Sequence, residues 1–578
     1  MQTQAGSGQP LPASDPREVR AALTRPGGLF EIQTEDVRGT AMPVFRNRLR
    51  SLRELLEETA RFGDRMYIVD EDVRLTFTEH LNRVNALAHA LQSELGITAG
   101  DRVALFAANR WDWLVAFWAV VRAGAIPCAM NGWWTPAEFR HAADLVEPAL
   151  VIGDRQRLER VTAAGVDIPV LSLDDDLLPL LRKHEGSVPA GVMGAEDDPA
   201  LLMFTSGTTG RPKAVTLPHR SIIGFAQANL FSEVAARAAY GLPAPARIDD
   251  VAPNDDVVLV TAPLFHVSML KGSALTAAAK GSRIVLLPGR FDPERVLQTI
   301  ERERVTGWSA LGSAALRVAT CEALGRYDTS SVAYLGVGGA PVSPAVQELL
   351  RAAFPSAARR LGMGYSSTEA GAVIANIGGA EYLAHPTATG RPTVTVEIEL
   401  RDETGAPAVG GEYGEVHVRS PYTMLGYWND PAASAEVLKD GGWLALGDIA
   451  RFEGGLLYID ARARDMILVS AENVSPTEVE FALEESPEVD EAAVLAVDDE
   501  VTGDAVCAVV VPRPGAAPTA TRLAEWCRAR LAHYKVPTRW HLIDGPLPRT
   551  ATGKLAKREL RAWIDAGAQA PGPASGGG

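Results

Sequence analysis

Cysteine and long apolar runs are scarce in this chain of 578 residues. The four cysteines, Cys128, Cys321, Cys507 and Cys527, lack the C-x-x-C spacing of a zinc site or a redox-active dithiol. We expect them to be small core residues in a reducing compartment. The longest apolar run, Leu114 to Val121, is far shorter than the roughly 20 residues of a membrane-spanning helix, and the N-terminus lacks the pattern of a secretion signal. The sequence therefore predicts a cytoplasmic protein.

Lysine is also scarce, and the charge balance is strongly acidic. Only eight of the 56 basic residues are lysines, and the formal net charge is -16. Such a charge repels polyanions at long range, which argues against broad binding to nucleic acid or to an anionic membrane. A lysine inside a glycine-rich or loop motif therefore stands out as a candidate for a local contact with a phosphate.

Changes in composition and periodicity along the sequence divide the chain into four predicted parts. Residues 1–45 show no clear periodicity and should form an arm on the body, and the Gly-rich tail 566–578 should be disordered. Between them, residues 46–464 should form a large domain and residues 465–565 a small α+β domain. The 47% hydrophobic content is sufficient for such a multidomain core.

Short apolar runs alternate with helical patterns in the large part, which predicts α/β layers with largely parallel sheets. Buried strands are expected at 102–107, 149–152, 257–260, 284–287 and 332–335, with helices near 52–59 and 111–121. In the small part we expect strands at 466–469, 492–497 and 505–511, with helices at 475–485 and 523–531.

The strongest chemical signal is the run Thr205-Ser-Gly-Thr-Thr-Gly-Arg-Pro-Lys213, which follows an apolar strand. Its glycines allow backbone N–H groups to turn toward an anion, while Thr205, Ser206, Thr208 and Thr209 add donors and Lys213 adds positive charge. The spacing differs from the G-x-x-x-x-G-K-[ST] motif of P-loop NTPases. The run therefore predicts a loop that binds a triphosphate in another fold.

This loop resembles the phosphate loop of the adenylate-forming superfamily, which contains acyl-CoA synthetases, non-ribosomal peptide adenylation domains and beetle luciferases. Further motifs follow in the same order as in that superfamily, from about residue 50 to residue 560. They are Pro263-Leu-Phe-His266, Gly338-Gly-Ala-Pro341, Gly364-Tyr-Ser-Ser-Thr-Glu369, Gly426-Tyr-Trp-Asn-Asp-Pro431, Gly447-Asp448, Asn473-Val-Ser-Pro-Thr-Glu-Val-Glu480 and Pro548-Arg-Thr-Ala-Thr-Gly-Lys554. The resemblance implies a large domain of two stacked α/β subdomains plus a barrel-like part, followed by a small mobile C-terminal domain.

The resemblance also implies roles for individual residues. Glu369 would hold Mg²⁺, Tyr365 would stack on adenine, and Asp448 would accept hydrogen bonds from both ribose hydroxyls. Lys554 would reach between the substrate carboxylate and the α-phosphate and, with Thr208 and Glu369, would complete the catalytic set. The other residues implied to contact the nucleotide are Gly339, Ala340, Ser366, Thr368 and Arg462.

The acyl side of the site is less well specified by the sequence. His266 occupies the position where amino-acid-activating relatives have an aspartate that pairs with the substrate amine, so we expect a plain carboxylic acid as substrate. The small residues Gly338 and Gly364, with Gly312, Ser313 and Ala314 nearby, would leave room for a bulky or long acyl group, and Trp308 could form one wall. A purely structural role for His266 is equally compatible with the sequence.

Several positions depart from the superfamily pattern. Ala214 and Ala461 replace glycines, and Leu446 replaces a threonine before Gly447. Ser470 and Ala471 replace two glycines of the loop that, with Glu472, would line the pantetheine tunnel of coenzyme A. Asp465 resembles the hinge about which the small domain rotates. Because more of the changes lie on the nucleotide side, we expect adenylation to be the weaker half-reaction.

The leading hypothesis is thus an AMP-forming acyl-CoA ligase that uses ATP, Mg²⁺ and coenzyme A. Two alternatives stay open: transfer of the acyl group to an acyl carrier protein, and a nucleotide-binding descendant without ligase activity. The acid, the pathway and the oligomeric state, for which a homodimer is one option, are not specified by the sequence.

Overall fold

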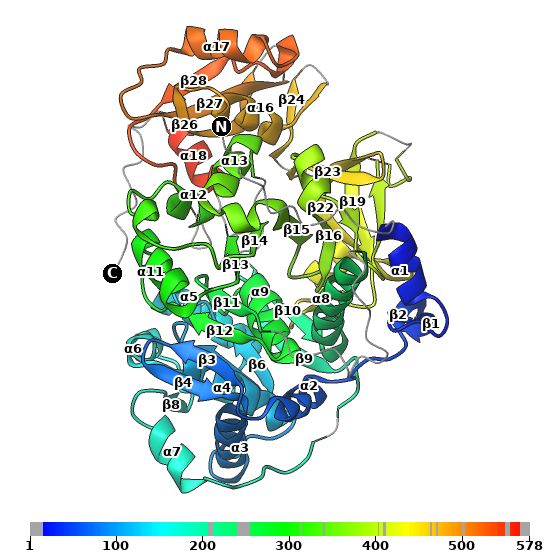
Figure 1. Ribbon diagram of the computed structural model, residues 1–578, viewed down its shortest axis with the longest axis vertical. Helices are drawn as coiled ribbons and strands as arrows, with labels where there is room; N and C mark the ends of the chain where they lie inside the picture. Colours follow the sequence, from blue (N-terminus) through cyan, green and yellow to red (C-terminus); the bar gives the residue numbers. More distant parts are fainter. Residues whose placement is uncertain are drawn as a thin grey trace, which may run out of the picture.

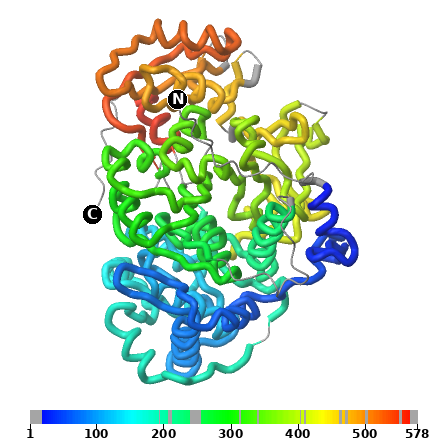
Figure 2. Tube along the Cα trace, in the orientation of Figure 1, coloured from blue at the N-terminus to red at the C-terminus, as the bar shows by residue number. Residues whose placement is uncertain are grey.

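The computed structural model describes residues 16–192, 194–205, 212–239, 255–311, 314–338, 342–402, 404–408, 412–462, 465–469, 472–499, 503–549 and 555–566. Figures 1 and 2 show a large body, blue to yellow, with a smaller orange and red unit at one end. Within the described ranges, no helix combines the length and the apolar character needed to cross a membrane. The four cysteines are unpaired thiols, and Cys128, Cys507 and Cys527 are buried, as expected for core residues.

The N-terminal arm contains more regular structure than its sequence predicted. It consists of α1 (Pro16–Thr24) and the hairpin of β1 (Ile32–Val37) and β2 (Thr40–Phe45). Phe30 contacts Phe231 of α8 (His219–Ala239) edge to face, with 5.4 Å between ring centroids. Arg38, in the hairpin turn, donates to the carbonyl of Thr423 at 3.1 Å. These contacts fix the arm on the body (Figure 1).

Two large sheets form the body. The first has the strand order β20-β10-β9-β6-β5-β7-β8. Its strands are β5 (Arg102–Phe106), β6 (Ile126–Ala129), β7 (Leu150–Gly153), β8 (Val170–Ser172), β9 (Pro199–Thr205), β10 (Lys213–Pro218) and β20 (Gly426–Tyr427). Strands β5 to β9 run parallel, whereas β10 and β20 add antiparallel pairs at one edge.

The second sheet has the order β17-β16-β15-β14-β13-β11-β12-β3-β4, with a parallel centre and antiparallel edges. Its strands are β3 (Met66–Asp70), β4 (Val73–Thr76), β11 (Val257–Val260), β12 (Arg283–Leu286), β13 (Gly307–Leu311), β14 (Tyr334–Gly338), β15 (Leu361–Ser366), β16 (Val373–Gly378) and β17 (Arg391–Pro392). The predicted α/β fold with largely parallel sheets is therefore confirmed.

Helices separate and cover the sheets. Helices α3 (Phe77–Ser93) and α4 (Trp111–Arg122) share one hydrophobic cluster with both sheets and lie between them. Residues 112–121 of α4 are all buried, which explains why this helix lacks a polar face. The outer face of the first sheet carries α5 (Pro136–Val146) and α6 (Arg155–Ala164), and that of the second carries α11 (Pro293–Glu303), α12 (Ala314–Ala319) and α13 (Pro344–Ala353).

Two smaller antiparallel systems complete the chain. The barrel-like part of the body contains β18 (Glu397–Arg401), β19 (Gly414–Arg419), β21 (Leu438–Lys439), β22 (Trp443–Glu453) and β23 (Leu456–Arg462). The C-terminal unit contains β24 (Ile467–Val469), β25 (Glu472–Val474), α16 (Pro476–Glu484), β26 (Val489–Asp499), β27 (Gly503–Pro512), α17 (Ala520–Arg528), β28 (Arg539–Leu542) and α18 (Lys557–Asp565). The predicted domain boundary at residues 464 and 465 lies between β23 and β24 and stays a prediction.

The C-terminal unit docks on the body through polar contacts. The hydroxyl of Ser475 donates to the carbonyl oxygen of Asp460 on β23 at 2.6 Å. Burial raises the pKa of the Asp460 carboxyl to about 6.

At a second contact, Ser343, the N-cap of α13, hydrogen-bonds Glu484 of α16, and burial raises the pKa of Glu484 to about 7. Neighbouring Glu480 and Glu491 add to this rise, while Ser343 and Arg549 oppose it.

These shifts predict that docking weakens as the pH rises. In the docked arrangement Glu484 keeps its proton up to about pH 7, whereas an exposed glutamate loses its proton near its ordinary pKa. The docked form therefore binds more protons between those values, so raising the pH from the ordinary glutamate pKa to about 7 progressively favours the undocked form. Energy transfer between fluorophores on the two units should report this change, and Glu484→Gln should reduce it to the part that Asp460 contributes. The exposed neighbour provides the control: Glu485→Gln should behave as wild type, and a pH-independent wild type would contradict the prediction.

Candidate active site

The predicted phosphate loop connects two paired antiparallel strands. Thr205 ends β9, Lys213 begins β10, and the two residues are direct partners in the register. Both side chains are half-buried. The strand pairing therefore holds the two ends of the loop together. Ser206, Thr208 and Thr209 lie outside the described residues, so their predicted contacts stay predictions.

A tyrosine that the sequence did not single out brings together two of the predicted residues. Tyr427 of β20 pairs with Val215 of β10, so its ring lies beside the base of the phosphate loop. The Lys213 ammonium lies 4.8 Å from the centroid of this ring, and the Tyr427 hydroxyl donates to Oε1 of Glu369 at 3.1 Å. Burial, and then the negative charge of Glu369, raise the pKa of Tyr427. Lys213 and Glu369 are thus linked through one phenol.

Tyr365 and Asp448 form a second polar pair. Tyr365 lies on β15, and its hydroxyl contacts Oδ2 of the buried Asp448 at 2.5 Å. Asp448 lies on β22 directly opposite Arg462 of β23 in the register. Ser366 is exposed at the end of β15, and Thr368 is half-buried in the loop that follows. The structure therefore brings together several of the predicted nucleotide contacts, while Gly339 and Ala340 lie outside the described residues.

The residues predicted to line the acyl group differ in their surroundings. Gly338 and Gly364 are direct partners on β14 and β15. His266 caps α9 (Val267–Met269), with its Nδ1 at 2.7 Å from the Ser268 hydroxyl. Trp308, in contrast, is fully buried in the hydrophobic cluster of the second sheet, and its indole N–H donates to Thr261 at 3.1 Å. This placement favours a packing role for Trp308 over the predicted wall of an acyl pocket.

The predicted functional residues of the C-terminal unit fall largely outside the described part of the chain. Ser470, Ala471 and Lys554 lie outside it, and Glu472 is placed only through its backbone at the start of β25. Asp465 is half-buried between β23 and β24. Their roles stay predictions.

Glu369 provides a suitable single ligand for a nucleotide-bound cation. Within the described ranges, no cluster of three or more histidine, cysteine or acidic side chains could hold a metal ion. Mg²⁺ in nucleotide enzymes is usually held by one or two carboxylates together with phosphate oxygens and water. The half-buried carboxylate of Glu369, which Tyr427 links to Lys213, fits this requirement.

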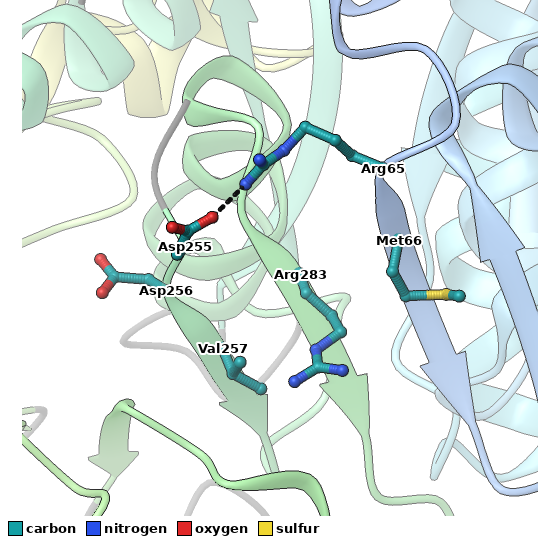
Figure 3. Close-up of a pocket in the computed structure, with 6 residues that line it drawn as sticks. All are labelled: Arg65, Met66, Asp255, Asp256, Val257 and Arg283. Atoms are coloured by element: carbon teal, nitrogen blue, oxygen red, sulfur yellow. Dashed lines mark hydrogen bonds and ion pairs between the residues drawn. The ribbon is translucent and has the colours of Figure 1, made fainter. Parts of the chain in front are cut away.

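Two hollows lie near the sheets. Figure 3 shows one at the beginnings of β3, β11 and β12, lined by both aspartates and arginines, in which Arg65 pairs with Asp255 at 2.7 Å. Because these strands are parallel, this hollow lies at the edge of the sheet opposite to Gly338 and Gly364. The other lies between α8 and β16. Its lining residues are Gly224, Phe225, Ala228, Asn229, Ser232, Ala372, Val373, Asn376, Thr393 and Tyr422.

Comparisons with known proteins identify the family of the chain. The family of AMP-binding enzymes matches residues 55–428, and the AMP-binding enzyme C-terminal domain matches residues 478–554. A feruloyl-CoA synthase from an Amycolatopsis species is 34% identical over 494 residues, covering 84% of this chain and 93% of the relative. A 3-[(3aS,4S,7aS)-7a-methyl-1,5-dioxo-octahydro-1H-inden-4-yl]propanoyl:CoA ligase from Rhodococcus jostii is 31% identical and covers 88% and 97%.

A solved structure supports the same grouping. The amide bond synthetase McbA from Marinactinospora thermotolerans superimposes with a TM-score of 0.76 at 30% identity, covering 89% of this chain and 99% of that one. The matches confirm the predicted enzyme class, an AMP-forming acid–thiol ligase. The chain belongs to the AMP-binding enzyme family of the adenylate-forming superfamily.

Proposed function

We propose that the protein converts a carboxylic acid and ATP to an acyl-AMP and then transfers the acyl group to the thiol of coenzyme A. The observation that carries this proposal is the link from Lys213 through Tyr427 to Glu369 at the end of the phosphate loop. It supplies a cation for the triphosphate and a carboxylate for the accompanying metal at one place. The relatives that are named as CoA ligases support coenzyme A as the acceptor.

The chain's own residues position the reactants. Asp448 would accept hydrogen bonds from the ribose hydroxyls, which would replace its present contact with the Tyr365 hydroxyl. Lys213 would neutralise charge on the phosphates, and Tyr427 would keep Glu369 oriented by donating to one of its oxygens. Mg²⁺, held by Glu369, would stabilise negative charge on the phosphate oxygens. Lys554 would supply a second cation, between the carboxylate and the α-phosphate.

We propose a bulky, non-amino-acid substrate. His266 occupies the position of the aspartate that pairs with an amine in amino-acid-activating relatives, and its ring contacts the Ser268 hydroxyl. Gly364 has no side chain to occupy the space beside Val373, whose methyl group lies 3.8 Å from the place of a Cβ on Gly364. The fused-ring acid in the name of the Rhodococcus relative is of the size we propose.

A screen tests the overall reaction. Candidate acids would be incubated with ATP and either coenzyme A or a phosphopantetheinylated carrier protein, with AMP release measured and the thioester identified by mass. We expect AMP release that depends on the acid and on coenzyme A. Thioester on the carrier protein alone would establish the carrier-loading alternative, and pyrophosphate release with no acid would contradict the ligase assignment altogether.

We further propose that adenylation is the slower half-reaction. Ala214 is fully buried in a hydrophobic cluster, so its methyl group packs in the core rather than at the nucleotide. The effect should therefore come from Leu446, which lacks the hydroxyl usual before Gly447, and from Ala461, opposite Ile449 in the β22–β23 pair. A loss of about 1.4 kcal/mol in transition-state stabilisation slows a step about tenfold.

Single-turnover rates of the two steps with one acid check this prediction. Acyl-AMP formation should be at least about tenfold slower than thioester formation from supplied acyl-AMP, and Leu446→Thr should narrow the gap. Fast acyl-AMP formation followed by slow transfer would contradict the prediction and would instead implicate Ser470 and Ala471.

A further inference from the structure

Lys271 is a buried cation for which the fold supplies no anion. Its side chain is 1% exposed. It donates to the hydroxyl of Ser221 at 3.0 Å and to the carbonyl oxygen of Gly371, and its ammonium lies 5.2 Å from the centroid of the Phe225 ring. No carboxylate forms an ion pair with it in the described part of the chain. Burying a charge without an opposite charge costs free energy, so stability alone does not account for this lysine.

The carbonyl oxygen of Gly371 has a second hydrogen-bond donor besides Lys271. The hydroxyl of Ser221 also donates to the oxygen of Gly371, at 3.1 Å. If Lys271 were an apolar side chain of the same length, Ser221 and Gly371 would still satisfy each other. Burial lowers the pKa of Lys271 to about 7, in keeping with the cost of its charge. The Gly371 carbonyl therefore does not require the lysine as a donor, which directs attention to the two segments that the contact of Lys271 with Gly371 joins.

Lys271 connects the two sides of the site. It lies on η3 (Leu270–Leu275), a π-helical stretch between α9, which His266 caps, and α10 (Thr276–Lys280). Such insertions in helices occur frequently at functional sites. Gly371 ends the loop that follows Tyr365 of β15 and contains Glu369. It has a φ of +64°, and a Cβ there would meet the Tyr422 carbonyl oxygen at 2.1 Å, so the loop end is tightly confined.

We propose that Lys271 is a positioning residue for acyl-AMP formation, which fixes the loop that follows Tyr365 and bears Glu369 to the helical run that begins at His266. The inference rests on the proposed adenylate chemistry. By holding Gly371, the ammonium keeps the nucleotide side and the acyl side in one geometry. The contact of Lys271 with Gly371 would then help to position both the Tyr365 ring, which would stack on adenine, and the Glu369 carboxylate, which would hold the metal.

Lys271→Met tests this role without activity as the only readout. AMP would be the probe, because it requires Tyr365 and Asp448 but no acid and no metal. We expect the variant to bind AMP about tenfold more weakly, with faster hydrogen exchange in residues 365–371 and a melting temperature equal to or above that of wild type. Lys280→Met is the matched control: this lysine lies on the same helical run and pairs with Glu233. It should bind AMP as wild type does.

A second variant separates the hydrogen bond from the bulk of the side chain. Lys271→Gln keeps a donor for the Gly371 carbonyl and should recover AMP affinity to within about threefold of wild type. The proposal would be overturned if Lys271→Met bound AMP as wild type does, or if Lys271→Met and Lys271→Gln lost equal amounts of AMP affinity. It would also be overturned if AMP affinity fell only in those variants whose melting temperature fell. A wild type that binds AMP but adenylates no acid would count against the proposed function and leave these readouts intact.

Discussion

Replacing Lys554 with alanine is expected to lower the rate of acyl-AMP formation by about 10²-fold or more. This is the scale of the loss when a well-placed group that stabilises transition-state charge is removed. The lysine would neutralise negative charge that develops as the substrate carboxylate attacks the α-phosphate. Because this charge is absent when the thiol attacks a preformed acyl-AMP, conversion of supplied acyl-AMP to the thioester should persist.

The surroundings of Lys554 provide a matched control. On the N-terminal side of Lys554, the backbone of Arg549 forms an isolated antiparallel β-bridge with that of Leu555. The Arg549 guanidinium forms an ion pair with Glu491 of the C-terminal unit at 3.0 Å. On its C-terminal side, Arg558 is an exposed cation on α18. Arg558→Ala removes a nearby positive charge and should leave both half-reactions unchanged. Rapid-quench measurement of each half-reaction compares the two variants, and an equal loss of both steps in Lys554→Ala would contradict a role confined to adenylation.

The sequence predicted strands well where their side chains are large and apolar. The strand at 257–260 has the predicted bounds, because Val257 to Val260 show a continuous apolar run. The strand predicted at 332–335 instead begins at Tyr334 and continues to Gly338. Its second half is rich in glycine, which has no side chain to reveal a pattern. Backbone pairing with β13 and β15, invisible in the sequence, extends this strand.

The site was predictable only in part, for a related reason. Motifs identified Lys213 and Glu369, but their link through Tyr427 depends on the pairing of β20 with β10, whose residues are more than 200 positions apart. Trp308 looked like a pocket wall because it adjoins small residues, yet alternation along β13 directs its side chain into the core. Lys271 belongs to no motif, and only the packing of η3 against α8 shows that it is buried.

Asp465→Pro is expected to preserve one half-reaction and to lower the other by about 10²-fold. In the proposed reaction one site would receive Lys554 for adenylation and the Ser470–Ala471 loop for thioester formation, and both lie in the sequence of the C-terminal unit. The chain would then have to change its backbone angles between β23, which ends at Arg462, and β24, which begins at Ile467. Proline fixes φ near −65° and removes the N–H, so it should retain a single arrangement. A catalytic group misplaced by even 1 Å can lose about 10²-fold in rate.

The substitution is informative because it leaves the side chains that dock the unit on the body unchanged. The polar contacts of Ser475 with Asp460 and of Glu484 with Ser343 join the unit to the body, and neither involves Asp465. Asp465→Ala removes the same carboxylate but leaves φ free, so it should retain both half-reactions and serves as the control. Rates of acyl-AMP formation and of thioester formation from supplied acyl-AMP, measured separately for the two variants, distinguish a backbone effect from a side-chain effect. If the proline variant carried out both steps at wild-type rates, the rotation would have to occur elsewhere in the chain, and Asp465 would not be the hinge.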